Sequence, residues 1–441
     1  MDLADLGATQ LVQMIESGEI SALELVEACI TRIDAKEEEI GAWAHLDYNI
    51  ARKQAEHCDA HQASGAPCDP LHGIPVGIKD IFDTNEYPTE NGTVLDAGRK
   101  PDENCTVVNQ LMAAGAVIMG KTVTTELAVY SPGKTANPHD VNRTPGGSSS
   151  GSAAAVACGM VPLAIGSQTN GSVIRPASFC GVVGFKPTHG LISRAGVLKL
   201  SQNLDHVGVF ARSIEDAALI AECLIGYDPA DPDTQLKPAP NLCDITVQDP
   251  PDEPNFAFIK TPVWDQADQA TQDAFEELAA FLGDSCDEVT LPGEFDSVVP
   301  SLQKVMTADL AKNFAPYTDR GKDKISEILC GLIAEGLQVE AVDYNACIEN
   351  RAALNTYIQG ICSEYDAIIA PAAIGEAPLG LDTTGNPIFC TLWTYLGVPA
   401  VSLPLLAGEN GLPVGVQVVS SVDNDAHLLR SARWLAGKIA G

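Results

Sequence analysis

Basic residues are scarce in this sequence. Its 441 residues include 26 Lys and Arg against 59 Asp and Glu, which gives a formal net charge of -33. A nucleic-acid-binding surface needs clustered Lys and Arg to contact phosphates, so this balance argues against a nucleic-acid partner. The acidic excess is typical of a soluble, self-repelling surface.

Several other features are absent. No apolar run reaches the length of a membrane span, and the opening MDLADLGATQ lacks the basic and apolar regions of a signal peptide. The thirteen cysteines are odd in number and include no CxxC pair, which argues against a disulfide framework and a zinc site. These absences predict a cytoplasmic protein with reduced thiols, no membrane partner and no metal.

The sequence does contain alternating helix and strand patterns. Ser21 and Glu24 form a capping box ahead of apolar residues at helical spacing. Further helices are expected at 106–114, about 151–158, 214–224, 270–283 and over most of 301–365, and strands at 73–84, 115–122, about 161–166, 255–261, 366–373 and 398–406. The Pro- and Asp-rich segment 227–254 is predicted to be a surface connection. The alternation predicts an α/β fold.

The stretch GAVIMGKT at 115–122 matches the phosphate-binding pattern GxxxxGK[ST]. A true phosphate loop follows a strand and has a loop interior whose amides surround phosphate. Here the interior Ala-Val-Ile-Met is typical of a strand, and the preceding segment is helical. We therefore expect Lys121 to be structural.

A second pattern, GSSSG at 147–151, matches the nucleophile elbow GxSxG with Ser149 at its centre. That elbow requires a strand directly before it, and an acid and a histidine further along the chain. The preceding NPHDVNRTPG is rich in turn residues and polar. We expect Ser149 and the later His189, His206 and His427 to be structural.

A third interpretation uses both Ser/Gly-rich loops of the stretch RTPGGSSSGSAAAVACGMVPLAIGSQTNGSVIRPASFCG, residues 143–181. Together with LHGIPVGIKDIFD, GAVIMGKTVTTELA, LDHVGVFARS and GLPVGVQVV, it resembles the amidase signature family, which includes small-molecule amidases and the amidase subunit of glutamyl-tRNA amidotransferase. The resemblance implies one large domain over 1–441, with a central mixed sheet covered by helices on both faces. Its core motifs lie at 70–210, and a variable region that shapes the substrate pocket lies at about 227–390.

The resemblance also implies a Ser-Ser-Lys triad. Lys79 is the base, Ser172 is the nucleophile, and Ser148, which follows a cis peptide from Gly147, passes the proton between them. A serine hydroxyl is a poor nucleophile until a base takes its proton, and a lysine can act as that base only when neutral. Burial beside apolar residues such as Ile78 would favour the neutral amine.

The loop 168–172 is expected to supply the oxyanion hole from the amides of Thr169, Asn170, Gly171 and Ser172. Most relatives have glycine at Asn170, and asparagine is the side chain that best tolerates left-handed backbone. Many relatives have aspartate at Gln168. The arginine of SVIRP is displaced by one position from that of many relatives, so we expect Arg175 to form a structural ion pair.

The implied function is hydrolysis of a small-molecule amide through an acyl-enzyme, with no metal or organic cofactor. Pocket residues are expected near Ala128 and Tyr130, and relatives are often homodimers. Trp393 and Tyr395 are candidates either for pocket aromatics or for core residues, and we favour the core. The alternatives are the amidase subunit of a tRNA-dependent amidotransferase, a hydrolase of urea-like compounds such as biuret or allophanate, and a non-catalytic or nucleotide-binding protein with the same fold.

Overall fold

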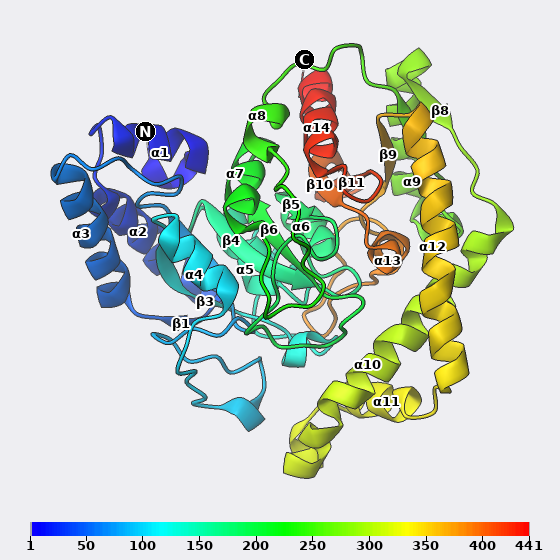
Figure 1. Cartoon of the computed structure of the whole chain (residues 1–441), viewed down its shortest axis with the longest axis horizontal. Coiled ribbons are helices and arrows are strands. Elements are labelled where there is room, and N and C mark those ends of the chain that lie inside the picture. Colours follow the sequence, from blue (N-terminus) through cyan, green and yellow to red (C-terminus); the bar gives the residue numbers. More distant parts are fainter. Residues whose placement is uncertain (1, 441) are drawn as a thin grey trace.

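One mixed sheet forms the centre of the protein. The computed structural model describes residues 2–440, and within them the strands join in the order β1-β3-β2-β4-β6-β5-β10-β11-β9-β7-β8 (Figure 1). The strands are β1 (Trp43–Leu46), β2 (Pro75–Lys79), β3 (Val117–Thr122), β4 (Leu163–Gln168), β5 (Val183–Lys186), β6 (His206–Ala211), β7 (Phe256–Phe258), β8 (Cys286–Glu288), β9 (Ala367–Pro371), β10 (Ala400–Ala407) and β11 (Pro413–Val419). The group β3-β2-β4 is parallel, whereas β4-β6-β5-β10-β11-β9 is antiparallel throughout.

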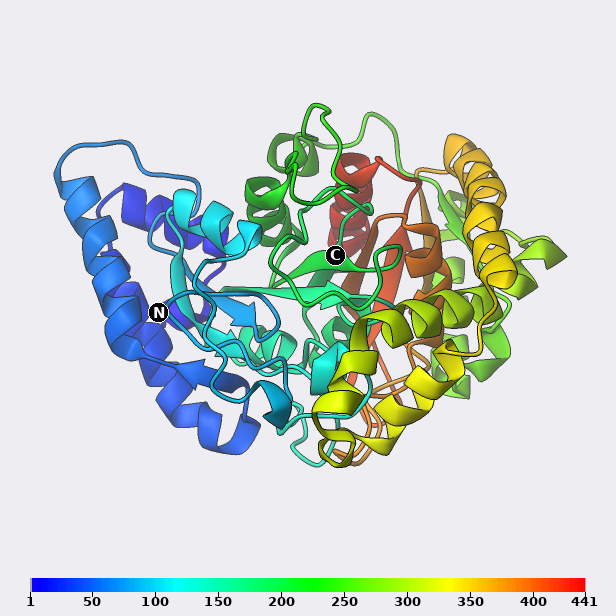
Figure 2. The ribbon, with the colours of Figure 1, turned by 60° about the horizontal axis from the view of Figure 1, so that its bottom comes forward.

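Helices cover both faces of this sheet (Figures 1 and 2). They are α1 (Ala8–Glu16), α2 (Ala22–Ile40), α3 (Tyr48–Ala63), α4 (Thr106–Ala113), α5 (Ser150–Ala157), α6 (Ile174–Cys180), α7 (Ile214–Leu224), α8 (Leu242–Thr246), α9 (Gln269–Leu282), α10 (Val298–Gly321), α11 (Glu327–Gly336), α12 (Ala341–Glu364), α13 (Ile388–Leu396) and α14 (Asp425–Ala440). Helices α5 and α6 pack together on the sheet, and α7, α8 and α14 form a second packed group. The predicted α/β fold with a central mixed sheet is confirmed.

The helices and strands lie close to their predicted positions. The capping box of Ser21 and Glu24 is present at the start of α2, and α7 has the predicted bounds. Strand β4 begins later than expected, at Leu163, because Pro162 has no amide hydrogen to give to a sheet ladder. The segment 227–254 is only partly a surface connection, since it contains α8 and a buried Asp231.

The GAVIMGKT stretch forms the end of the turn after α4 and then strand β3. Lys121 is fully buried inside this strand and forms an ion pair with Asp80 at 3.0 Å. Because its amino group is committed to Asp80, to Pro88 O and to the Thr89 hydroxyl, it has no freedom to bind phosphate. The structural role expected for Lys121 is confirmed.

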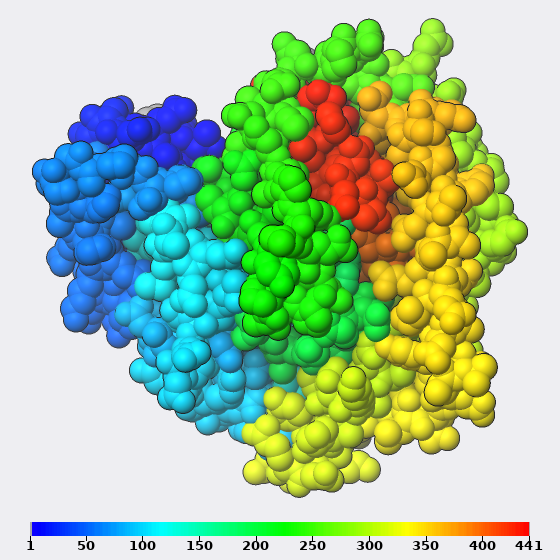
Figure 3. Space-filling view, viewed as in Figure 1, coloured from blue at the N-terminus to red at the C-terminus, as the bar shows by residue number. Residues whose placement is uncertain are grey.

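Two apolar clusters support the sheet. The larger one lies around β2 to β6, and the second joins α10, α12, α13 and β9. Trp393 and Tyr395 are fully buried in the second cluster, as expected for core residues. In the space-filling view, α14 (red) lies between the green segment that contains α7 and the orange-yellow α12 (Figure 3). In residues 2–440 no helix has both the length and the apolar composition to cross a membrane.

Candidate active site

The parallel pairing of β2 with β4 brings the predicted site together. Val76 to Ile78 pair with Leu163 to Ile165, so both strands end at the same edge of the sheet. Lys79 is the last residue of β2, and the loop 169–172 directly follows β4. Parallel neighbours place the residues at their carboxyl ends side by side, so Lys79 lies beside the end of β4 that leads into this loop.

Lys79 is fully buried, and its amino group touches two serines. Nζ donates to Ser148 Oγ at 2.7 Å and to Ser167 Oγ at 2.9 Å. In the described part of the chain it forms no ion pair with a carboxylate. Burial therefore lowers the pKa of Lys79 well below that of a free lysine, and the negative charge of Asp205 opposes this shift. The environment favours the neutral amine, which is the form that can accept a proton.

Ser148 is held beside the lysine by its backbone. The Gly147–Ser148 peptide is cis, as the resemblance implies, and the Ser148 carbonyl accepts a hydrogen bond from the Thr125 amide at 3.2 Å. A side chain at Gly147 would meet Thr384 Cγ2 at 2.8 Å, so this position has room only for glycine. These contacts fix the hydroxyl that receives the hydrogen bond from Lys79.

Ser172 lies in the turn between β4 and α6 and is half-buried. Among residues 2–440 its hydroxyl makes no hydrogen bond, and so it is not bonded to Ser148 in this structure. The structure thus joins Lys79 to Ser148 directly, and within the described residues it shows no hydrogen bond of the Ser172 hydroxyl.

The loop before Ser172 presents free amide donors. Within the described residues, the amides of Asn170, Gly171 and Ser172 donate to no other protein group. A Cβ at Gly171 would lie 2.9 Å from Pro387 Cβ, so the loop packs closely against the start of α13. Unpaired amides in a row are suited to receive a developing negative charge.

Gln168 supports this loop in the place where many relatives have aspartate. Its side-chain oxygen accepts hydrogen bonds from the amides of Val173 and Ile174, at 2.8 and 3.0 Å. Its amide nitrogen donates to Thr394 Oγ1 at 2.9 Å. Gln168 thus binds the first amides of α6, which otherwise have no intrahelical partner.

Asn170 does not behave as expected. It is absent from the residues of positive φ, so tolerance of left-handed backbone is the wrong reason for its presence. Its side chain instead accepts from Thr391 Oγ1 at 2.8 Å and donates to the Tyr130 hydroxyl at 3.4 Å. Asn170 therefore ties the loop to α13 and to the predicted pocket residue Tyr130.

Ala128 has an unusual backbone conformation. Its φ is 58°, which is rare for a residue with a side chain. It lines a cavity of about 20 Å³ together with Ser167, Thr169 and Asp205. Of the two predicted pocket residues, Tyr130 contacts the loop 168–172 through Asn170, and Ala128 borders this cavity.

Arg175 contradicts the expected ion pair. It is buried, and its Nη2 donates to the Gly147 carbonyl at 2.7 Å and to Thr384 Oγ1 at 3.1 Å. Its Nε and Nη1 have no hydrogen-bond partner, and no described carboxylate pairs with it. The prediction failed because Arg175 points toward the cis peptide, where its partners are neutral oxygens.

Ser149 is structural, as expected. It is fully buried, and its hydroxyl donates to the Ser167 carbonyl at 3.2 Å. The neighbouring hydroxyls are also committed to backbone carbonyls, that of Ser150 to Gly146 and that of Ser152 to Ile165. None of these contacts involves a histidine, as a nucleophile elbow would require.

Two residues near the lysine were not identified from the sequence. Ser167 accepts from Lys79, and Asp205 accepts from Thr169 Oγ1 at 2.7 Å. Burial raises the pKa of Asp205 to about 6. Ser167 could have been found from its alternation with Thr169, because residues two apart in a strand share a face. Asp205 lies in the LDHVGVFARS motif, but its position depends on the pairing of β4 with β6.

The site contains no metal-like cluster. Among residues 2–440, no three His, Cys, Asp or Glu side chains are grouped so as to hold an ion. The chemistry available at this site is that of two serines, a buried lysine and a row of backbone amides.

Comparisons with known proteins show the family to which the chain belongs. A family model described as Amidase matches residues 24–429. A glutamyl-tRNA(Gln) amidotransferase subunit of Chloroflexus aggregans is 33% identical over 457 residues, which cover 94% of this chain and 93% of that protein. One similar solved structure is the inhibitor-bound form of a vestigial protein complex, described with the evolutionary origins of an s-triazine catabolic enzyme. Its TM-score is 0.91 at 27% identity, and the match covers 98% of both chains. The native peptide amidase from Stenotrophomonas maltophilia has a TM-score of 0.85 at 26% identity, covering 99% of this chain and 98% of its own. The chain therefore belongs to the amidase signature family of amide-hydrolysing enzymes.

Proposed function

We propose that this protein hydrolyses the C–N bond of a small-molecule amide, with Ser172 as nucleophile, Ser148 as proton relay and Lys79 as base. The observation that carries the proposal is the 2.7 Å hydrogen bond from a fully buried, unpaired Lys79 to Ser148. Burial without a carboxylate partner favours the neutral form of an amine, and only that form can take a proton from serine.

In the first half of the reaction, Ser172 Oγ attacks the amide carbonyl. Its proton passes to Ser148 Oγ, and the Ser148 proton passes to Lys79 Nζ, which becomes charged. The carbonyl oxygen becomes negative and is bound by the amides of the loop 170–172. When the tetrahedral intermediate collapses, the C–N bond breaks, and the proton returns from Lys79 through Ser148 to the leaving nitrogen.

In the second half, water takes the place of the amine. A water molecule attacks the acyl-enzyme and loses its proton through Ser148 to Lys79, and the same amides bind the second oxyanion. Collapse of this intermediate returns the proton to Ser172 Oγ and releases a carboxylic acid. The products are a carboxylate and ammonia or an amine, and every proton transferred is returned.

An assay of ammonia release from a library of primary amides tests this function. Wild-type protein and Ser149→Ala are expected to release ammonia from the same amides, because the Ser149 hydroxyl contacts only backbone. Ser172→Ala is expected to release none above background. Equal activity of Ser172→Ala and the wild type would overturn the assignment of the nucleophile.

The amidotransferase relatives support a second candidate function, as the amidase subunit of a tRNA-dependent assembly. We favour an independent enzyme, which is supported by the similarity of nearly the whole chain to a solved peptide amidase. Urea-like amides belong in the library because one structural neighbour is described with the origins of an s-triazine catabolic enzyme. Purification of tagged protein from its own host, with its mass measured in solution, separates a homodimer from an assembly with other subunits. Stable co-purification of other chains, with glutamine as the preferred amide, would favour the amidotransferase.

A further inference from the structure

Asp205 lies directly beside the proposed oxyanion loop. Strands β4 and β6 are antiparallel neighbours, and Ser167 pairs with Val207 while Gln168 pairs with His206. One step further along the same register, Thr169 lies opposite Asp205. Their side chains meet there, with the Thr169 hydroxyl donating to Asp205 Oδ1 at 2.7 Å.

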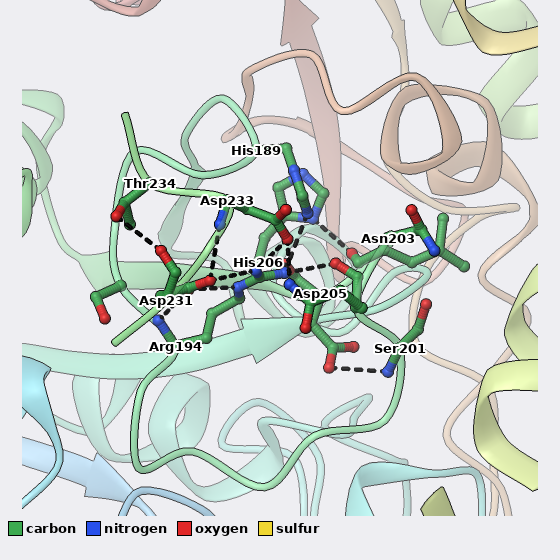
Figure 4. Close-up of polar contacts among 12 residues, drawn as sticks. His189, Arg194, Ser201, Asn203, Asp205, His206, Asp231, Asp233 and Thr234 are labelled. Carbon is green, nitrogen blue, oxygen red and sulfur yellow. Dashed lines mark hydrogen bonds and ion pairs between the residues drawn. The ribbon is translucent and has the colours of Figure 1, made fainter. Parts of the chain in front are cut away.

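The Asp205 carboxylate is firmly held. Its second oxygen accepts the backbone amides of Leu200 and Ser201, both at 2.9 Å. Arg194 holds the same turn from outside, because it donates to the carbonyls of Asp205 and Gln202 at 3.2 and 2.7 Å (Figure 4). Arg194 is in turn paired with Asp231 at 2.7 Å and with Asp233. The turn thus has a fixed geometry before any substrate binds.

A small cavity lies between Asp205 and the surroundings of the lysine. Its volume is about 20 Å³, and its lining includes Asp205, Thr169 and Ser167. Ser167 is the second hydrogen-bond partner of Lys79, at 2.9 Å. A cavity of this size has room for about one water molecule. Asp205 therefore borders this cavity directly, and the Lys79 amine is connected to it through its hydrogen bond to Ser167.

We propose that Asp205 is a positioning residue for the amidase reaction: its carboxylate fixes the oxyanion loop through Thr169, and its negative charge acts across the cavity on Lys79. The inference rests on the proposed function, because it takes Lys79 as the base. In the reaction Lys79 becomes a buried cation with no adjacent carboxylate, and a buried charge without a partner is strongly disfavoured. The fixed negative charge of Asp205 stabilises that cation.

Other charged and titratable groups surround Asp205. Arg194 faces its turn from the segment after β5, and Lys199 and His206 border the same cavity. Asp309 on α10 accepts from the Ser201 hydroxyl at 2.5 Å. Burial lowers the pKa of His206 well below its ordinary value, so this ring stays neutral at pH 7. With a pKa of about 6, Asp205 is largely ionised at neutral pH.

The test measures the rate at which a fluorophosphonate labels Ser172, between about pH 5 and 9, in wild type, Asp205→Asn, Thr169→Val and Thr169→Ser. Removing the Asp205 charge makes Lys79 a weaker base. The acidic limb of the Asp205→Asn profile is therefore expected to move to lower pH by about one unit. Thr169→Val keeps the charge and loses the hydrogen bond, so its rate is expected to fall about tenfold with the limb unmoved. Thr169→Ser is expected to restore the rate.

Asp309→Asn is the matched control, since it removes a neighbouring buried carboxylate that does not touch the site. Its profile is expected to follow the wild type, and thermal unfolding confirms that each variant is folded. An unmoved limb in Asp205→Asn would contradict the charge effect, and a wild-type rate in Thr169→Val would contradict the positioning of the loop. If Asp205→Asn does not fold, the labelling rates of Thr169→Val and Thr169→Ser still test whether the loop is positioned through Thr169. Failure of the proposed function is distinct, because wild-type protein would then not be labelled at Ser172.

Discussion

At the level of single residues, the proposed site depends on the buried amino group of Lys79. Lys79 is the last residue of the fully buried strand β2, and it contacts hydroxyls rather than a carboxylate. Lys121 makes the contrast clear, because it is equally buried but paired with Asp80. These two lysines of similar burial thus have different partners, hydroxyls for Lys79 and a carboxylate for Lys121.

The lowered pKa of Lys79 predicts a pH dependence. The neutral amine is the base, and its fraction increases as pH rises through the pKa of Lys79, so the rate of Ser172 labelling should rise with pH to a plateau. In Lys79→Ala the rate should be about 10²–10⁴-fold lower, as for loss of a general base. Labelling rates over a pH series check both points. A rate that falls steadily from pH 6 to 8 in the wild type would contradict a neutral lysine base.

At the level of helices and strands, hydrogen bonds made by two side chains, Gln168 and Thr394, stabilise the turn from β4 to α6. Gln168 binds the first amides of α6, and Thr394 on α13 donates to the Asn170 carbonyl. The sequence indicated that Gln168 departs from the family pattern, but it did not indicate what the amide does, because its partners depend on how α6 begins.

Removal of the Gln168 hydrogen bonds to the first amides of α6 should destabilise the turn. Gln168→Leu leaves the buried amides of Val173 and Ile174 without a partner, which is expected to lower the free energy of unfolding by about 1–3 kcal/mol. Gln168→Glu retains an acceptor at the helix start and should lose less. Urea unfolding of the two variants measures the difference. Equal stability of Gln168→Leu and the wild type would contradict the capping role.

The buried ion pair between Lys121 in β3 and Asp80, which follows β2, allows a second test of stability. Lys121→Met leaves Asp80 buried without its cation, and loss of one partner of a buried pair is expected to lower the free energy of unfolding by about 3–5 kcal/mol. The double variant Asp80→Asn with Lys121→Met should recover part of that loss. Chemical unfolding provides the measurement.

A rise in Tm of the wild type on addition of ATP would instead support the nucleotide site that we excluded.

At the level of the whole molecule, local patterns predicted much of the fold. Amphipathic α7 and buried β2, β3 and β9 were identified because their apolar residues follow the helix or strand period. The strand order was not derivable from these patterns, since β6 pairs with β4 only through contacts distant in sequence. For this reason Lys79, Ser148 and Ser172 were named as candidate site residues from motifs, whereas the position of Asp205 beside Thr169 depends on the pairing of β4 with β6.

The net charge of -33 makes the whole molecule sensitive to salt. Like charges repel more strongly in the compact state, and salt screens this repulsion, with a Debye length of about 10 Å at 0.1 M. We expect Tm to rise as NaCl increases from about 10 mM to about 500 mM. Sucrose solutions without added salt control for general co-solvent effects, which also raise stability. A Tm that falls with NaCl would show that the surface ion pairs outweigh the repulsion.

The proposed mechanism depends above all on Ser172 being a nucleophile activated by Lys79 through Ser148. Its most direct test is intact-protein mass spectrometry with peptide mapping after exposure to a fluorophosphonate, on wild type, Ser172→Ala, Ser149→Ala and Lys79→Ala. We predict one adduct, mapped to Ser172, that is absent from Ser172→Ala, unchanged in Ser149→Ala and formed far more slowly in Lys79→Ala. An adduct that maps to Ser149, or that forms at the wild-type rate without Lys79, would contradict this mechanism.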